Sequence, residues 1–495
     1  MYYLGIDLGS SSIKIALVEK DTGKRISVIQ EPDGEMSMHA PKMGWAEQQP
    51  EVWWDLVCKG IKRVIKDHSV AKEDILGLGI AYQMHGLVIV DGEGNALRNS
   101  IIWCDSRAVA IGDAAYEKIG MENCDAHLLN APGNFTASKL SWVKTNEPEL
   151  FDKIYKFMLP GDYVAYKLSG RATTTVSGLS EGIFWDFEKK DISEEILSHF
   201  GIPRSMVPDI VDTFGVQSKV SPKGALESGL LEGTPILYRA GDQPNNALSL
   251  NVFEPGELAA TGGTSGVVYA VTDNLSVRES SRVNNFAHVN YHEDNQTRIG
   301  KLLCINGAGI QYRWLLNNLS VSSYDEMNTL ASEVEIGSEG VCVIPFGNGA
   351  ERMLKNMDIG TRIVNLNLNR HSKAHLCRAA LEGIAFSFVY GMEIMKSDGV
   401  KPKVIRAGND NLFRSEIFSS TIATLIEEEI EIYNTTGAIG AARACVIGEQ
   451  GYGKFTSFMD NDHVMTYMPC KDRAPYKEAY ENWKKELEII IKTKR

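Results

Sequence analysis

The sequence lacks the cysteine spacings that bind metals or form redox centres. Its eight cysteines, in 495 residues, include no CxxC pair and no zinc-ligand spacing. It also shows no signal-peptide pattern and no run of 18 apolar residues. These absences argue against a zinc or thioredoxin-like protein and against a membrane protein. They predict reduced, buried thiols in a cytoplasmic protein.

Basic residues are too few to outweigh the acidic ones. The chain has 51 Lys and Arg against 64 Asp and Glu, a formal net charge of −13 at pH 7. Nucleic acids and anionic membranes are bound by clustered basic residues, so neither is expected as a partner. A polyanion such as ATP would have to be bound locally, by turn amides and a metal ion.

Two widespread nucleotide-binding motifs are missing as well. The sequence contains no G-x-x-x-x-G-K-[ST] and no G-x-G-x-x-G, so neither a P-loop NTPase nor a Rossmann dehydrogenase is supported. What the chain does have is size: 495 residues with 43% hydrophobic content are enough for two or more domains.

Two stretches about half a chain apart repeat one pattern. Apolar strands over 2–6 and 13–18 flank a small-residue turn at 7–12, and strands over 258–260 and 267–270 flank a turn at 261–266. Successive turn amides can point into one concavity and bind an anion such as phosphate. The repetition predicts a duplicated architecture with a phosphate turn in each half.

Asp7 ends the first predicted strand, and Lys14 lies in the second. The Asp7 carboxylate could hold Mg²⁺ through water, because Mg²⁺ prefers oxygen ligands and keeps several waters. The alternative is an Asp that caps its own turn; the presence of the second turn favours the metal. Lys14 has two equal interpretations, a contact to phosphate or a solvated sheet edge.

Further polar groups stand at turns and strand ends. Asp242 lies between Gly241 and Gln243 and ahead of a proline, which is how a chain holds an acid at a tight turn. Gln83-Met84-His85-Gly86 follows a predicted strand over 75–82, and Trp103-Cys104-Asp105-Ser106-Arg107 ends one over 96–103. Open α/β sheets bind ligands at such strand ends.

Together, and in this order along nearly the whole chain, these stretches resemble the FGGY family of carbohydrate kinases, with the xylulokinases closest. The resemblance implies an α/β protein with the two-domain actin-like ATPase (ribonuclease H-like) fold. It implies a sugar-binding domain over 1–245, a nucleotide-binding domain over 246–495, and an active site in the cleft between them. Met84-His85 stands where glycerol kinases carry Arg-Glu, which favours a ketose.

The resemblance also implies roles for individual residues. The catalytic base would be Asp242, and Mg²⁺ would lie near Asp7. The expected sugar contacts are Met84, His85, Trp103, Asp105 and Gln243. The expected phosphate and nucleotide contacts are Gly9, Ser10, Ser11, Lys14, Gly262, Gly263, Thr264, Gly307, Gly408 and Asn409. Phosphoryl transfer needs mainly position and charge, which such a set supplies.

The second half departs from the family pattern at two points. Residues 356–362 replace the usual glycine-rich start of the second family signature, and Gly408-Asn409 stands where relatives have two or three glycines beside the adenosine. Fewer glycines leave less room for close backbone approach, so the nucleotide contacts are the least supported part of the resemblance.

We therefore expect an enzyme that uses ATP and Mg²⁺ to phosphorylate a ketopentose, D-xylulose to D-xylulose 5-phosphate. Its partners would be the sugar and ATP, and a homodimer is left open. Two alternatives also stay open. One is an FGGY kinase for L-xylulose, ribulose, a deoxyketose or gluconate; the other is a non-catalytic actin-like nucleotide or sugar sensor.

Overall fold

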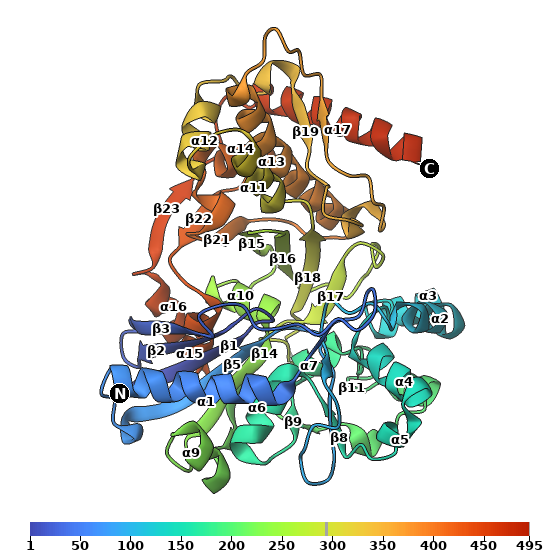
Figure 1. Cartoon of the computed structure of the whole chain (residues 1–495), viewed down its shortest axis with the longest axis vertical. Coiled ribbons are helices and arrows are strands. Elements are labelled where there is room, and N and C mark those ends of the chain that lie inside the picture. The colour runs from blue at the N-terminus through green and yellow to red at the C-terminus, as the bar shows by residue number, and fades with distance from the viewer. Residues whose placement is uncertain (293–295, 495) are drawn as a thin grey trace.

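The computed structural model describes residues 1–292 and 296–494 and is built on two β-sheets, one in each lobe (Figure 1). The first sheet contains β1 (Tyr2–Leu8), β2 (Ile13–Glu19), β3 (Arg25–Glu31), β5 (Ile75–Tyr82), β13 (Phe214–Lys219) and β14 (Pro235–Gly241). The second contains β15 (Glu257–Gly262), β16 (Gly266–Thr272), β17 (Asn284–Ala287), β18 (Ile299–Ile305), β21 (Val404–Gly408), β22 (Ile430–Tyr433) and β23 (His463–Tyr467).

The two sheets repeat one strand arrangement. Their orders are β13-β14-β5-β1-β2-β3 and β23-β22-β21-β15-β16-β18-β17. In each, a central hairpin (β1/β2 or β15/β16) has an antiparallel neighbour on one side, β3 or β18, and two parallel neighbours on the other. An antiparallel strand, β13 or β23, ends each series. The predicted duplication is confirmed, and β17 is the addition.

Both predicted hairpins form, with longer strands and shorter turns. Antiparallel pairing continues to Leu8 opposite Ile13 and to Gly262 opposite Gly266. Asp7 is therefore the next-to-last residue of β1, paired with Lys14, and not part of the turn. The turns shrink because each pair of strands keeps its ladder of hydrogen bonds as far as the backbone permits.

Helices cover the sheets. Those from the first half are α1 (Pro50–Asp67), α2 (Val109–Ile119), α3 (Met121–His127), α4 (Thr136–Asn146), α5 (Pro148–Phe151), α6 (Pro160–Ser169), α7 (Val176–Glu181), α8 (Glu194–Phe200), α9 (Pro222–Ser228) and α10 (Asp242–Ser249). Those from the second half are α11 (Gly309–Asn318), α12 (Tyr324–Ser332), α13 (Lys373–Ser397), α14 (Glu416–Ile426), α15 (Gly437–Ala444), α16 (Ile447–Met459) and α17 (Ala474–Lys494).

Short strands complete the loops between these elements. They are β4 (Glu47–Gln48), β6 (Val88–Val90), β7 (Ser100–Ile101), β8 (Lys156–Met158), β9 (Thr173–Thr174), β10 (Trp185–Asp186), β11 (Asp191–Ile192), β12 (Asp209–Ile210), β19 (Cys342–Ile344) and β20 (Arg362–Val364). Helix α1 buries Trp53 and Trp54.

One helix from the last quarter of the chain packs on the first sheet. In Figure 1 the red α15 and α16 lie in the lower lobe, and α15 contacts β1, β5 and α10. A Cβ at Gly5 would lie 1.9 Å from the Ala438 carbonyl oxygen, and one at Gly79 would lie 2.0 Å from that of Ala441. Glycine is required at these positions because the helix rests directly on the strand backbone.

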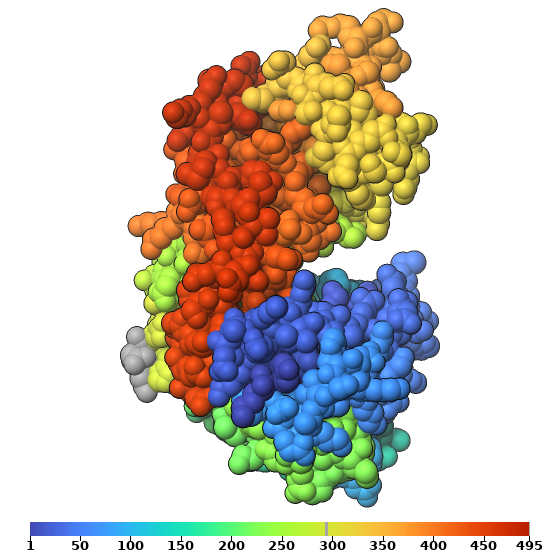
Figure 2. All heavy atoms as spheres, turned by 90° about the vertical axis from the view of Figure 1, so that its left-hand side faces the viewer, coloured from blue at the N-terminus to red at the C-terminus, as the bar shows by residue number. Residues whose placement is uncertain are grey.

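A deep notch separates the two lobes. Figure 2 shows it between the blue N-terminal residues below and the yellow residues above.

All eight cysteines are free thiols. Five are buried, whereas Cys104 and Cys470 are exposed, which differs from the prediction of buried thiols throughout. None of the described helices has the length and apolar character needed to span a membrane.

Candidate active site

A cavity of about 290 Å³ brings together residues that are far apart in the sequence. It is lined by Asp7, Gly9, Ser10, Ser11, Ser12, Lys14, Gln83, Trp103 and Asp242. These residues come from the β1/β2 hairpin, the end of β5, the loop after β7 and the start of α10. The first predicted phosphate turn, the predicted base and part of the predicted sugar site thus face one space.

Asp242 is held where β14 ends and α10 begins. Burial raises the pKa of its carboxyl to about 7, and the neighbouring Asp7 carboxylate adds to the rise. Hydrogen bonds from the Gln243 backbone and side chain oppose it by stabilising the charged form. A carboxylate that titrates near neutral pH is suited to accept a proton from a hydroxyl group.

Asp7 faces the same cavity from the end of β1. Burial raises the pKa of its carboxyl, and the charge of Lys14 acts in the opposite direction. Lys14 itself lines the cavity, which favours phosphate contact over a solvated edge. Within residues 1–292 and 296–494 no cluster of three or more His, Cys, Asp or Glu could hold a metal ion. One carboxylate beside serine hydroxyls fits a hydrated cation such as Mg²⁺, which needs few protein ligands.

His85 is fixed in a single orientation. Its backbone adopts a positive φ of 61°, and its ring packs edge-on against Phe135. Nδ1 lies 3.0 Å from the Glu181 carbonyl oxygen, which can only accept, so Nδ1 carries the proton. Burial and the Lys139 charge lower the His85 pKa to about 3, so the ring is neutral. Nε2 is therefore a hydrogen-bond acceptor, suited to a sugar hydroxyl.

The neighbours of His85 connect the sugar stretch to the phosphate turn. Gln83 Nε2 donates to Gln48 Oε1 at 3.2 Å, and Gln48 Nε2 donates to the Ser10 carbonyl oxygen at 2.7 Å. Gln83 Oε1 is buried and makes no hydrogen bond to any described residue. Met84 is buried against Gly241, directly before Asp242. Gln83 is a site residue that the predicted set omitted.

Trp103 and Asp105 have different surroundings. Trp103 is 52% exposed and donates from Nε1 to Ser10 Oγ at 3.4 Å. Asp105 is fully buried and does not line the cavity. Its Oδ2 accepts the Ala46 N–H at 2.6 Å, and both of its oxygens accept from Arg107. The predicted sugar contact of Asp105 does not fit, because internal donors already occupy its carboxylate.

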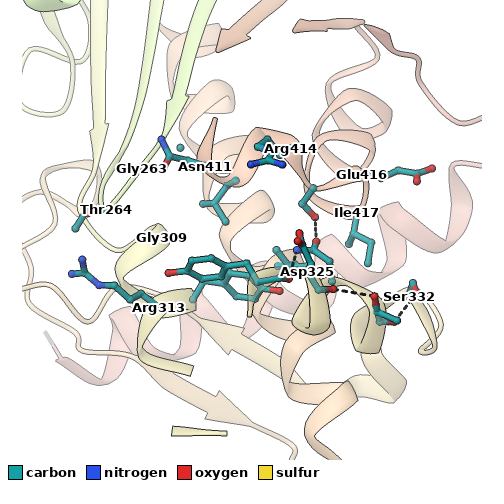
Figure 3. A pocket seen from close by; sticks show the side chains of 18 residues that line it. Gly263, Thr264, Gly309, Arg313, Asp325, Ser332, Asn411, Arg414, Glu416 and Ile417 are labelled. Carbon is teal, nitrogen blue, oxygen red and sulfur yellow. Dashed lines mark hydrogen bonds between the residues drawn. The ribbon is translucent and has the colours of Figure 1, made fainter. Parts of the chain in front are cut away.

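A second cavity, of about 750 Å³, lies beside the other phosphate turn (Figure 3). Its walls include Gly262, Gly263 and Thr264 from the turn, together with Gly309, Tyr312, Arg313, Tyr324, Asp325, Asn328, Thr329, Ser332, Leu381, Asn411, Leu412, Arg414, Ser415, Glu416 and Ile417. Figure 3 shows Thr264 and Arg313 towards one end and Glu416 and Ile417 towards the other. The cavity is large enough for a nucleotide.

The second turn is anchored to the helix that borders this cavity. The Gly309 and Ile310 N–H groups donate to the carbonyl oxygens of Gly263 and Thr264, both at 3.0 Å. Tyr312 and Tyr324 stack on each other with ring centroids 5.7 Å apart. Their stacked rings form an aromatic wall, a surface suited to the flat face of a nucleobase.

Three predicted nucleotide contacts lie outside this cavity. Gly307 approaches another loop, since a Cβ there would lie 2.3 Å from the Pro345 carbonyl oxygen. Gly408 ends β21, and the Asn409 N–H donates to the Tyr433 carbonyl oxygen at 2.8 Å. Gly307, Gly408 and Asn409 line neither of the two cavities, and their nucleotide contacts stay a prediction. Gly309 and Asn411, two or three residues further on, line the cavity instead.

Sequence reasoning missed two ionisable residues near His85. Glu181 ends α7 and contacts His85 through its backbone and its side chain. The signal for it was an acid within an otherwise small and apolar run, residues 176–185. Arg352 donates to the Ser280 carbonyl oxygen at 3.1 Å, and its charge helps to lower the His85 pKa. No local pattern identifies it, because it lies more than 250 residues along the chain.

Comparison with protein families matches both halves of the chain. Residues 2–249 match the N-terminal domain of the FGGY family of carbohydrate kinases, and residues 258–448 match its C-terminal domain. A xylulose kinase from Bacillus subtilis is 28% identical over 518 aligned residues, covering 100% of this chain and 99% of that protein. A xylulose kinase from Escherichia coli is 27% identical, with 90% of each chain covered.

A solved structure shares the whole fold. It is described as a xyloylose kinase from Brucella ovis and superposes with a TM-score of 0.87 at 25% identity. The match covers 99% of each chain. The arrangement of both lobes is therefore that of a known carbohydrate kinase structure.

Proposed function

The chain belongs to the FGGY family of carbohydrate kinases, and from this premise we propose that it transfers the γ-phosphate of ATP to D-xylulose, giving D-xylulose 5-phosphate. The xylulose kinases similar to this chain and the Met84-His85 pair support a ketopentose as substrate. The single observation that carries the proposal is Asp242: a carboxyl with a pKa of about 7 faces the cavity beside the first phosphate turn.

In the proposed reaction, Asp242 accepts the proton of the sugar O5 hydroxyl as O5 bonds to the γ-phosphorus. The bond from that phosphorus to the β-bridging oxygen breaks, and ADP leaves. His85 Nε2 accepts a hydrogen bond from a sugar hydroxyl, and Met84, Gln243 and Trp103 complete the sugar site. Asp105 acts indirectly, by holding the loop that carries Trp103. Positioning of this kind supplies much of phosphoryl-transfer catalysis.

Two turns bind the phosphates in this proposal. Gly9, Ser10, Ser11 and Lys14 contact them from the first lobe, and Gly262, Gly263 and Thr264 from the second. Asp7 would hold Mg²⁺, and the ion would supply positive charge that neutralises the phosphate oxygens. Backbone amides of the turns stabilise the transferred group without reorganising.

We also propose the division of labour between the halves. Residues 1–245 bind the sugar and residues 246–495 bind the nucleotide, with the anchoring helix α15 contributed to the sugar lobe by the second half. The free cysteines agree with a cytoplasmic location, which stays a prediction. A homodimer also stays a prediction.

The test is ADP formation by the purified protein with Mg-ATP and a panel of ketoses, polyols and aldonic acids at millimolar concentration. D-xylulose should give the largest kcat/KM. If L-xylulose, ribulose, a deoxyketose or gluconate gives a higher value, the kinase chemistry stands and the substrate is wrong. If no sugar accelerates ADP release, the non-catalytic sensor replaces the kinase.

The aromatic wall of the second cavity gives a separate prediction. Tyr324→Ala should raise the KM for ATP by about 5-fold, because loss of one stacking ring costs on the order of 1 kcal/mol. The KM for the sugar should not change, since Tyr324 lines only the nucleotide cavity. Steady-state kinetics with each substrate varied in turn measures both values.

Tyr155→Ala is the control for this variant. Tyr155 is also about half exposed, at 50% against 43% for Tyr324, but it lines neither cavity. An unchanged KM for ATP in Tyr324→Ala would show that the nucleobase does not stack on this aromatic wall.

A further inference from the structure

Glu181 is a buried acid that the proposed reaction does not use. It ends α7 and is 1% exposed. Its Oε2 makes no hydrogen bond of good geometry within residues 1–292 and 296–494, although the Tyr82 hydroxyl is close enough to the carboxyl to lower its pKa. Burying a carboxyl without a full set of partners is costly, so its presence next to the site requires an explanation.

Glu181 holds His85 from two directions. Its carbonyl oxygen lies 3.0 Å from His85 Nδ1, and its Oε1 accepts the His85 backbone N–H at 3.5 Å. The third polar contact comes from Lys139 Nζ, which donates to the His85 carbonyl oxygen at 2.7 Å. These contacts hold His85 at a positive φ of 61°, a conformation uncommon outside glycine.

The Glu181 side chain also packs against the turn that carries Asp242. A Cβ at Gly241 would lie 2.4 Å from Glu181 Oε2 and 2.6 Å from Met84 Cγ. Only glycine leaves room there for both groups. Glu181 is thus in contact with His85 on one side and with the residue before Asp242 on the other.

The surroundings of the Glu181 carboxyl favour its neutral form. Burial raises its pKa well above the ordinary value, and the Asp242 charge raises it further. The His85 N–H, the first opposing group, lowers it. A shift in this direction favours placing the negative charge of the pair on Asp242, where the proposed reaction needs it.

We propose that Glu181 is a positioning residue on the sugar side of the site. It contacts both the His85 stretch and the turn that carries Asp242. It therefore sets the separation between His85 Nε2, which accepts a hydrogen bond from one sugar hydroxyl, and the Asp242 carboxylate, which accepts the proton of the reacting hydroxyl. The inference rests on the proposed kinase function. What it requires at position 181 is a neutral side chain of this length with a hydrogen-bond acceptor, not a negative charge.

Two substitutions separate these requirements. Glu181→Gln keeps the length and the acceptor for the His85 N–H, and its kcat/KM for the sugar should stay within about 3-fold of wild type. Glu181→Leu fills the space without an acceptor, and the sugar KM should rise by about 10-fold, the usual cost of one lost buried hydrogen bond. The KM for ATP should not change in either variant.

The same steady-state kinetics, measured on a control variant, show which outcomes contradict the proposal. Glu117→Leu, at an exposed acid on α2, should leave all constants unchanged. The proposal is wrong if Glu181→Gln loses as much as Glu181→Leu, because a charge would then be needed. It is also wrong if Glu181→Leu keeps the wild-type KM for the sugar.

An NMR measurement separates this proposal from the proposed function. In ¹⁵N-histidine-labelled protein, the His85 backbone amide, assigned with a His85→Ala variant, should exchange with solvent at a similar rate in wild type and Glu181→Gln, because both keep the acceptor for this N–H. In Glu181→Leu, or Glu181→Met if the leucine variant does not fold, the same amide should exchange at least about 10-fold faster, the usual cost of one lost buried hydrogen bond. A wild-type protein that turns over no sugar would refute the function, whereas equal exchange rates in all variants would refute the role of Glu181.

Discussion

Asp242→Asn should lower kcat by about 100-fold or more, the usual size of a general-base contribution. The amide keeps the shape of the carboxyl but cannot accept the proton of the sugar hydroxyl. Sugar and ATP binding, measured by calorimetry, should persist, because neither depends on that proton transfer. Near-normal kcat would exclude Asp242 as the base.

The same variant should be more heat-stable than wild type at pH 8. The Asp242 pKa is raised in the folded protein to about 7, so the stability this group contributes is present below its unfolded value and is lost as pH rises through 7. The neutral amide avoids that loss, and the gain in Tm should shrink towards pH 4. Asp21→Asn, at an exposed turn, is the matched control and should change neither kcat nor Tm.

The activity of the wild-type enzyme should fall about tenfold per pH unit below pH 7. The reaction needs ionised Asp242, and the ionised fraction declines tenfold per unit below a pKa of about 7. Initial rates of ADP formation at low sugar concentration and saturating Mg-ATP, from pH 5 to 8, report kcat/KM directly.

A second carboxyl supplies the control for this profile. Burial raises the pKa of Glu351 to about 7 as well, and its Oε2 accepts the N–H groups of Asn306 and Gly307 at 2.9 and 3.2 Å. Glu351→Gln should keep the acid limb of the profile. If the limb disappears in that variant and not in Asp242→Asn, the limb belongs to Glu351.

Conformational strain and burial costs occur at the sugar site. His85 holds a positive φ, Asp242 resists ionisation, and Glu181 is buried without a full set of hydrogen bonds. Each of these lowers stability, and packing elsewhere must offset them. The Asp242→Asn stability gain measures one of these costs directly.

Local patterns in the sequence were sufficient to predict the strand–turn–strand unit that is repeated in the two sheets. Apolar runs on either side of small-residue turns predicted both hairpins, because such a pattern depends on neighbours only a few residues away. Glycine two residues after Asp7 and directly before Asp242 marked turns for the same reason. The family of the chain also followed from the order of these short motifs.

The tertiary structure decided which of those residues face a cavity. Asp105 and Gly408 stand in the expected motifs, yet one is saturated by Arg107 and the other ends a sheet strand. Glu181 joined the site through contacts with His85 and Gly241, 96 and 60 positions away. Hydrogen-bond satisfaction, burial and the raised pKa of Asp242 depend on groups that only folding brings together, so no local pattern could contain them.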